Sequence, residues 1–207
     1  MAKASWVKLS KTSGYSNGSV DVSAEEHTGR ISRTSELTFT ASGVNNVKRT
    51  VKQMAKPEFV ELDGNTFGAS SPSGGIVNIT GRSNAKSLTF SFEPLLGTLW
   101  GKVELTDRYA IGDMVISNGA DIDDDPGASK EYVFLYKLAL PENVSTTTDG
   151  WLRLVVTTES GATAKAEITV PHALPTLEVE PTGVVEIPWS GTAVAITVKS
   201  NTNWEIK

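Results

Sequence analysis

A short pattern that occurs twice limits the fold of this chain more than any other feature of its sequence. Residues 73–84 and 190–201 share a Ser-Gly pair, an alternating apolar segment and a final Ser-Asn pair, with the same spacing in both copies. A second match connects 37–43 with 155–161, where an alternating segment again runs into Ser-Gly. Similarity at intervals the size of a domain predicts tandem structural units.

Short segments of alternating polarity, bounded by Gly, Ser, Asn and Pro clusters, predict strands along most of the chain. Residues 35–40 and 47–53 are an example, because they are expected to form a hairpin with Leu37, Phe39, Val47 and Val51 on inward faces. The other expected strands are 59–62, 75–80, 87–92, 100–105, 113–117, 132–140, 151–157, 163–170, 177–179, 184–187 and 193–198.

Composition agrees with strands rather than helices. Thr, Val, Ser and Gly dominate, and β-branched side chains fit a pleated surface better than a helix. No window carries a helical apolar stripe, and 93–99 is expected to form one turn at most. We therefore predict an all-β protein made of tandem immunoglobulin-like β-sandwich domains.

Two proline-marked boundaries divide the chain, at Lys56-Pro57 and at 171–175, because proline lacks the ladder donor and restricts the residue before it. The expected ranges are a first unit at 4–55, a second at 57–171 with an insertion at 101–129, and a third at 175–207.

Three groups of residues resemble the BACON family, in which a strand ends in Ser-Asn, a Trp follows, and a Ser-Gly turn and a strand ending near an Asn come later. The second unit departs from this pattern, since Ser87-Leu88 stands where the Trp is expected. The matching positions are Ser200-Asn201 with Trp204 in the third unit, Trp6 with Ser13-Gly14 and 49–53 in the first, and Ser83-Asn84 with 138–143 in the second.

The resemblance implies immunoglobulin-like sandwiches and two classes of function. One is carbohydrate or mucin binding, as proposed for BACON modules attached to glycosidases and proteases of gut Bacteroidetes. The other is a structural role in virions of the phages that infect those bacteria. A fold by itself does not choose between them.

Charge and composition argue against several other classes. The net charge is -5 and the basic residues are scattered, whereas a nucleic-acid binder needs a basic stripe. The chain has no cysteine and no long apolar run, so we expect no disulfide, no thiolate metal site and no membrane insertion. The segment after Met1 has no apolar signal region, which favours assembly in the cytoplasm of the producing cell.

Residues with catalytic or metal-binding chemistry are few. His27 and His172 have no nucleophile or second ligand at usable spacing, so we expect no enzyme. Asp121, Asp123 and Asp125 alternate as in a calcium loop, which makes Ca²⁺ the one candidate cofactor. The pattern departs from such a loop because Pro126 stands where Gly is required and Glu131 is one place short; the alternative is an exposed, charged insertion loop.

Five tryptophans are candidates for stacking on sugar rings. Trp6 and Trp204 lie at the family's core position, and Trp151 begins an alternating strand, so these three are expected to be buried. Trp100 and Trp189 lie beside turns and are the candidate glycan-binding residues.

The first and third units are incomplete in complementary ways. Residues 4–54 lack the strands that should precede Trp6, and 176–207 contain strands of that kind. An incomplete sandwich exposes core residues and strand edges. Three arrangements would explain this: the chain is a piece of a longer protein, its last strands close its own first unit, or they complete a neighbouring chain.

The preferred interpretation is a non-enzymatic structural protein of a phage virion, decorating a capsid or tail or forming part of a head fibre. Its partners would be other virion proteins or copies of itself. The alternative is a carbohydrate- or mucin-binding or spacer module of a bacterial cell-surface protein, with surface glycans as its ligands.

Overall fold

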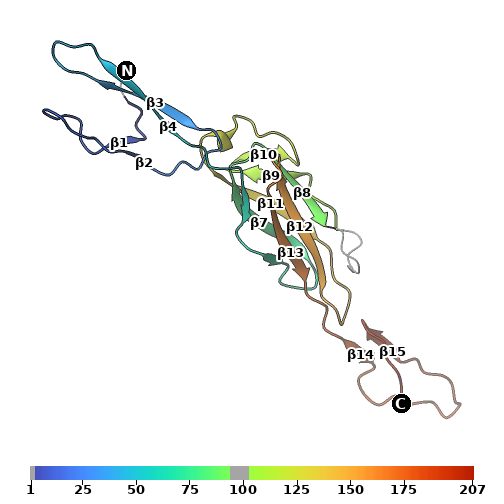
Figure 1. Ribbon diagram of the computed structural model, residues 1–207. Helices are drawn as coiled ribbons and strands as arrows, with labels where there is room; N and C mark the ends of the chain where they lie inside the picture. The colour runs from blue at the N-terminus through green and yellow to red at the C-terminus, as the bar shows by residue number, and fades with distance from the viewer. Residues whose placement is uncertain (1–2, 94–102) are drawn as a thin grey trace.

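The protein is all-β. The computed structural model describes residues 3–93 and 103–207 (Figure 1). The strands are β1 (Val7–Leu9), β2 (Val22–Ala24), β3 (Arg33–Phe39), β4 (Val47–Gln53), β5 (Val60–Leu62), β6 (Thr66–Gly68), β7 (Gly75–Ser83), β8 (Leu88–Glu93), β9 (Arg108–Ile111), β10 (Met114–Ser117), β11 (Tyr132–Leu140), β12 (Gly150–Thr158), β13 (Thr163–Val170), β14 (Leu177–Glu180) and β15 (Thr197–Ser200). One short 3-10 helix, η1 (Pro126–Ala128), lies between β10 and β11.

The centre of the molecule is an immunoglobulin-like sandwich. One sheet has the order β10-β9-β11-β7-β5 and the other the order β6-β13-β12-β8. Apart from the parallel β6–β13 pair, the pairings are antiparallel. In immunoglobulin lettering, β5, β7, β11 and β9 are strands A, B, E and D, while β8, β12 and β13 are C, F and G. The expected fold class is therefore confirmed.

The sandwich is held together by the inward residues of alternating strands. β11 buries every second residue. The ring of its Tyr136 stacks on the ring of Phe90 in the opposite sheet, with 4.2 Å between the ring centroids and 9° between the ring planes. The Phe134 ring makes an edge-to-face contact with the same Phe90 ring, at a centroid distance of 5.8 Å, and the Tyr109 ring centroid lies 5.2 Å from that of Phe90. Offset and edge contacts of this kind add specificity to the burial of large apolar surfaces.

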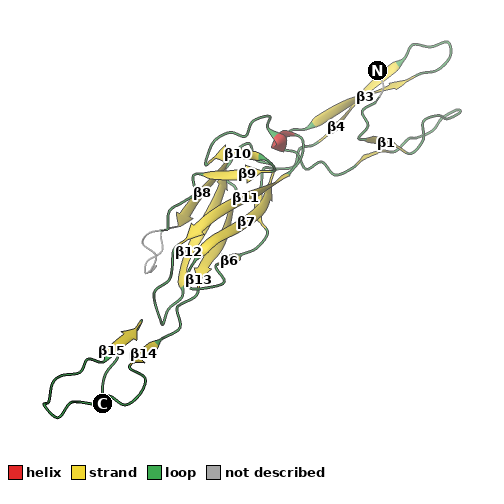
Figure 2. Cartoon of the chain, turned by 180° about the vertical axis from the view of Figure 1, so that it is seen from behind, coloured by secondary structure: helices red, strands yellow, loops and turns green. Residues whose placement is uncertain are grey.

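Smaller strand pairs lie on either side of the sandwich (Figures 1 and 2). β1–β2 and β3–β4 form an N-terminal unit at one end of the elongated molecule, and β14–β15 form a C-terminal hairpin at the other. The expected first range, 4–55, holds β1–β4, and the third, 175–207, holds β14–β15. The insertion 101–129 contains β9 and β10, which extend one sheet of the sandwich.

The internal repeat is a repeat of strand register. Val60 lies opposite Ser83 in β5–β7, and Leu177 lies opposite Ser200 in β14–β15, so each residue is displaced by 117 positions from its counterpart. In their pairing register the hairpins β3–β4 and β12–β13 are related by the same displacement, since Arg33 pairs with Gln53 and Gly150 with Val170, although the matching segments 37–43 and 155–161 are 118 positions apart. The N-terminal unit therefore repeats strands F and G, and the C-terminal hairpin repeats strands A and B.

Two expected strands are wrong, and the repeat explains why. Residues 184–187 form no strand because their counterpart, β6, exists only by pairing with β13, and no such strand lies beside the C-terminal hairpin. Of 193–198, only Thr197 and Val198 belong to β15, because the counterpart segment of β7 pairs with β11. An alternating sequence shows that a segment is able to form a strand, but the strand forms only where another strand is available to pair with it.

Other differences are local. Short strands β1, β2, β6 and β9 were not expected, and 103–105 form no strand although one was expected there. The expected turn at 93–99 lies outside the described residues, apart from Glu93 at the end of β8. In the part of the chain that the structure describes, no helix is long and apolar enough to span a membrane.

Candidate functional site

The acidic loop after β10 contributes to a junction between units. Both carboxylate oxygens of Asp125 accept hydrogen bonds of 2.6 Å from the Arg30 guanidinium of the N-terminal unit. The side chains are 29% and 18% exposed, so this bidentate pair is largely sheltered from water. The hydrogen bonds from Arg30 hold the pKa of Asp125 below its ordinary value, and those to Asp125 raise the pKa of Arg30.

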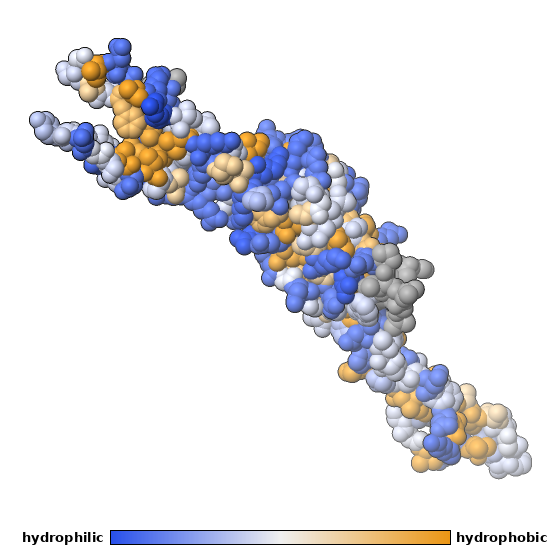
Figure 3. Space-filling view, in the orientation of Figure 1, coloured by the Kyte–Doolittle hydropathy of each residue, from blue (hydrophilic) through white to orange (hydrophobic). Residues whose placement is uncertain are grey.

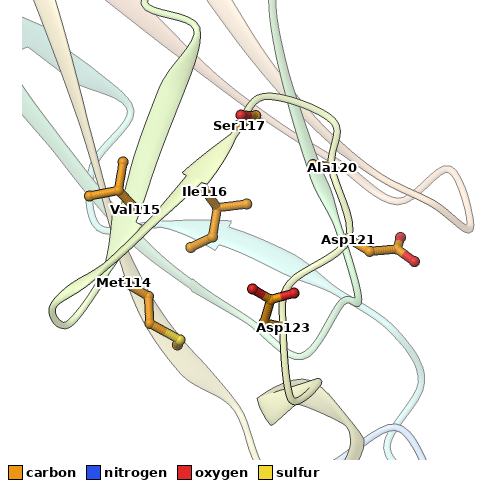
Figure 4. A pocket seen from close by; sticks show the side chains of 7 residues that line it. All are labelled: Met114, Val115, Ile116, Ser117, Ala120, Asp121 and Asp123. Carbon is orange, nitrogen blue, oxygen red and sulfur yellow. The ribbon is translucent and has the colours of Figure 1, made fainter.

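The three candidate calcium ligands do not converge on one point. Asp121 forms an ion pair with Lys86, and Asp125 faces Arg30. Asp121 and Asp123 line a hollow of about 400 Å³ beside β10 (Figure 4). Among residues 3–93 and 103–207, no group of three or more His, Cys, Asp or Glu side chains could hold a metal ion. Calcium binding by this loop stays a prediction.

The centre of the junction is Asn84, a residue that sequence reasoning noted only as part of a motif. It is fully buried, accepts a hydrogen bond from the Phe59 backbone N–H at 3.0 Å, and donates to the Thr28 carbonyl oxygen at 3.0 Å. One side chain thus ties the N-terminal unit to strand A and strand B of the sandwich. The Ser-Asn repeat was the signal that could have identified it.

Backbone contacts complete the junction. The amides of Arg30 and Ile31 donate to the carbonyl oxygens of Gly127 and Ala128 in η1, at 2.9 and 3.1 Å. A Cβ at Gly127 would lie 2.1 Å from the Asn84 carbonyl oxygen, so only glycine permits this approach. The first two units therefore meet through a specific, closely packed interface.

The two histidines make hydrogen bonds to residues near them in the fold. His27 is buried, and its Nε2 lies 2.7 Å from the Ile31 carbonyl oxygen. His172 follows β13, and its Nδ1 lies 2.7 Å from an Asp149 carboxylate oxygen. Hydrogen bonding by His172 lowers the pKa of Asp149.

Tryptophan burial differs from the expectation. Trp189 is 101% exposed, as a ligand-stacking residue must be, whereas Trp100 lies outside the described residues. The expected burial of Trp151 and Trp204 is wrong, since they are 38% and 51% exposed. Trp151 is on the outward face of β12 because the register buries Gly150 and Leu152. Trp6 is half-buried, with the Arg33 guanidinium 4.7 Å from its ring centroid.

A second hollow lies within the N-terminal unit. It has a volume of about 530 Å³ and is lined on its apolar sides by Leu9, Val20, Leu37 and Phe39. Of the residues expected to face inward in this unit, Leu37 is buried, whereas Phe39 and Val47 are 46% and 47% exposed. Hydrophobic surface gathers both here and on the C-terminal hairpin (Figure 3). We call the hollow the acceptor groove; the expected incompleteness of the first unit was the signal for it.

Comparisons with known proteins identify neither a family nor a function for this chain. No protein-family model matches the chain, and no curated protein matches it. Solved structures with some likeness include zebrafish RET cadherin-like domains 1 to 4 (12% identity, TM-score 0.36, covering 70% of this chain and 34% of that one) and protocadherin gamma B2 extracellular cadherin domains 1–5 (9%, 0.39, 97% and 38%).

An endo-fucoidan hydrolase of glycoside hydrolase family 107 is a third such structure, with 10% identity, a TM-score of 0.32, and coverage of 84% of this chain and 23% of that one. The chain thus spans well under half the length of each structure that it matches. At TM-scores this low, these likenesses carry no argument about function.

Proposed function

We propose that this chain is a non-enzymatic structural protein of a phage virion surface, built from BACON-like immunoglobulin-like units. It decorates a capsid or tail or forms part of a head fibre, and it is assembled in the cytoplasm of the bacterial host. Its partners are other virion proteins or copies of itself. Its work is surface recognition and assembly, with no covalent bond made or broken.

The observation that carries this proposal is the junction between the first two units. A flexible string of domains has exposed, polar linkers with few contacts across them. Here a buried Asn84, the bidentate Arg30–Asp125 pair and direct backbone hydrogen bonds fix one unit against the next. A protein that projects units from a particle surface at a set spacing needs a connection of this kind.

Purified phage particles provide the test. Antibodies raised against the 207-residue chain should label particles in immunogold electron microscopy after density-gradient purification and nuclease treatment. Labelling at regular positions on the capsid or tail is the expected result. Labelling of host cell envelopes, with none on particles, would contradict the proposal.

Trp189 supports a second candidate function, a carbohydrate-binding or spacer module of a bacterial cell surface. Its fully exposed indole is available to stack on a sugar ring. Binding to immobilised intestinal mucin should then be lost in Trp189→Ala and kept in Val144→Ala, which removes another exposed apolar side chain. Equal mucin binding by both variants, or none by the unmodified chain, would exclude this function for Trp189.

A further inference from the structure

The C-terminal hairpin exposes residues whose counterparts form the core of the sandwich. Val60 is 6% exposed and Ile79 is fully buried, whereas the residues 117 positions later, Leu177 and Ile196, are 59% and 54% exposed. All of β14 is exposed. The hairpin therefore has the apolar pattern of strands A and B, in the register of strands A and B, without the sheet on which such strands pack.

The N-terminal unit has the opposite deficiency. Its hairpin β3–β4 has the register of strands F and G, yet Phe39 is 46% exposed where its counterpart Val156 is fully buried. Phe39 lines the acceptor groove. In the sandwich, the apolar side chains that cover the corresponding strands include those of β5 and β7. The groove is thus the space that an A–B hairpin fills.

We propose that the C-terminal hairpin of one chain inserts into the acceptor groove of a second copy and completes an immunoglobulin-like sandwich there. The contact is strand addition, in which backbone hydrogen bonds give affinity and alternating side chains give specificity. The inference goes beyond the virion role and does not depend on it, because it rests only on register, burial and the groove.

The arrangement of the chain selects a second copy as the occupant. The acceptor groove and the C-terminal hairpin lie at opposite ends of the elongated molecule, with the sandwich between them (Figures 1 and 2). A hairpin from the same chain would have to cross the length of that sandwich. A head-to-tail contact between copies uses two different surfaces, so it repeats from copy to copy, giving a ring where the rotation closes and an open filament where it does not.

The register of the insertion follows from the sandwich. Residues 22–27 align with 138–143 at a displacement of 116, one less than elsewhere, because the loop after Asn143 is one residue longer than the loop after His27. His27 hydrogen-bonds to the carbonyl of Ile31, four residues later, and Asn143 donates to that of Thr148, five residues later. In the sandwich, Leu138 of β11 lies opposite Val77 of β7.

The counterpart of Leu138 is Val22, and that of Val77 is Val194. Insertion therefore places Val22 of one chain opposite Val194 of another and extends β2 and β15 as a pair. Both side chains are more than 40% exposed in the single chain, at 41% and 43%.

Insertion also explains an unusual pairing in the single chain. β1 pairs with β2, whereas β8, which occupies the place of β1 in the sandwich, pairs with β12 of the other sheet. Without strand B, the edge of β2 takes β1 as its partner. We expect β1 to move to β3 when the donated hairpin arrives, which leaves β2 free to pair with the donor.

Size exclusion coupled to light scattering tests the proposal on the full chain. The unmodified protein should form a concentration-dependent series of linear oligomers. Ile196→Asp in the donor hairpin and Phe39→Asp in the acceptor groove should each give a monomer, because a charge cannot be buried unpaired in the completed core. Val144→Asp, at an exposed position of the sandwich outside both surfaces, is the matched control and should oligomerise normally.

Mixing the two monomeric variants gives the sharpest result. The Ile196→Asp chain keeps an intact acceptor, and the Phe39→Asp chain keeps an intact donor, so the mixture should form one dimer that cannot extend. Circular dichroism of each variant checks that the sandwich stays folded. A monomeric unmodified chain at high concentration, or a mixture of folded variants that stays monomeric, would overturn the proposal.

Discussion

Asn84 and Asn201 make the same hydrogen bonds in two successive units, but only Asn84 is buried. Each accepts from a backbone amide 25 residues earlier, of Phe59 at 3.0 Å and of Thr176 at 2.8 Å. Each also donates to a carbonyl before that amide, of Pro57 and of Leu174. Asn84 is 0% exposed, whereas Asn201 lies at the surface. The local A–B geometry therefore forms without the rest of a sandwich around it.

Asn84→Ala should lower the free energy of unfolding of the sandwich by about 2–4 kcal/mol. It leaves the Phe59 amide and the part-buried carbonyl oxygens of Thr28 and Pro57 without this partner, at about 1–3 kcal/mol for a buried unsatisfied group. Urea denaturation followed by near-ultraviolet circular dichroism measures the change. Asn201→Ala is the matched control, and its effect at low protein concentration should be within about 0.5 kcal/mol because water replaces the lost bonds. Equal effects at the two positions would contradict this account.

Acid should weaken the junction of the first two units. The pKa of Asp125 is lowered from 3.8 in the folded protein, so its contribution is complete above that value and is lost as the pH falls through the lower folded pKa. We expect the protection of the amide hydrogens of Arg30 and its neighbours, relative to intrinsic exchange at the same pH, to fall below pH 3.8, measured by hydrogen–deuterium exchange with mass spectrometry.

Asp125→Asn should remove that acid transition. It should also lower the free energy of opening of the junction at neutral pH by about 1–2 kcal/mol, because hydrogen bonds to charged groups are stronger than those between neutral groups. Lys8 and Glu25 form an exposed pair within the N-terminal unit, and Glu25→Gln is the control that should leave the junction unchanged. Unaltered exchange at Arg30 in Asp125→Asn would show that the pair does not hold the junction.

Gly127→Ala should separate η1 from strand B. The added methyl group would lie 2.1 Å from the Asn84 carbonyl oxygen, which is backbone and cannot rotate away. Such overpacking costs about 1–3 kcal/mol or more, and we expect a midpoint of thermal unfolding several degrees lower. Gly14→Ala, where a Cβ meets nothing within 4 Å, should leave the midpoint unchanged. A Gly127→Ala protein as stable as the unmodified one would show that the junction tolerates a wider approach.

The sequence predicted the strands that have partners and overpredicted those that do not. Residues 132–140 and 163–170 were expected with the observed bounds, since their alternation is long and both faces are determined. Val194 and Ile196 alternate equally well but belong to no strand, because pairing depends on a neighbour that a single sequence does not reveal. Trp151 shows a related limit, since a shift of one residue in register moves a side chain to the opposite face.

The contacts around the candidate residues could be predicted less well than the fold. Alternating aspartates indicated a shared ligand, but an ion pair with Arg30, 95 residues away in the sequence, orients Asp125 elsewhere. The junction at Asn84 and the acceptor groove depend equally on contacts between distant segments. Local patterns identify side chains capable of such contacts, whereas the topology decides which partners they meet.

An engineered disulfide tests the central claim, that one chain completes another, most directly. The chain has no cysteine, so Val22→Cys and Val194→Cys can be made in separate proteins and mixed under mild oxidation. Residues opposite each other on paired strands lie within disulfide reach. The account predicts rapid formation of a mixed dimer, detected by non-reducing electrophoresis, with little cross-linking in either protein alone. Homodimers forming as fast as the mixed dimer, or no cross-link at all, would contradict it.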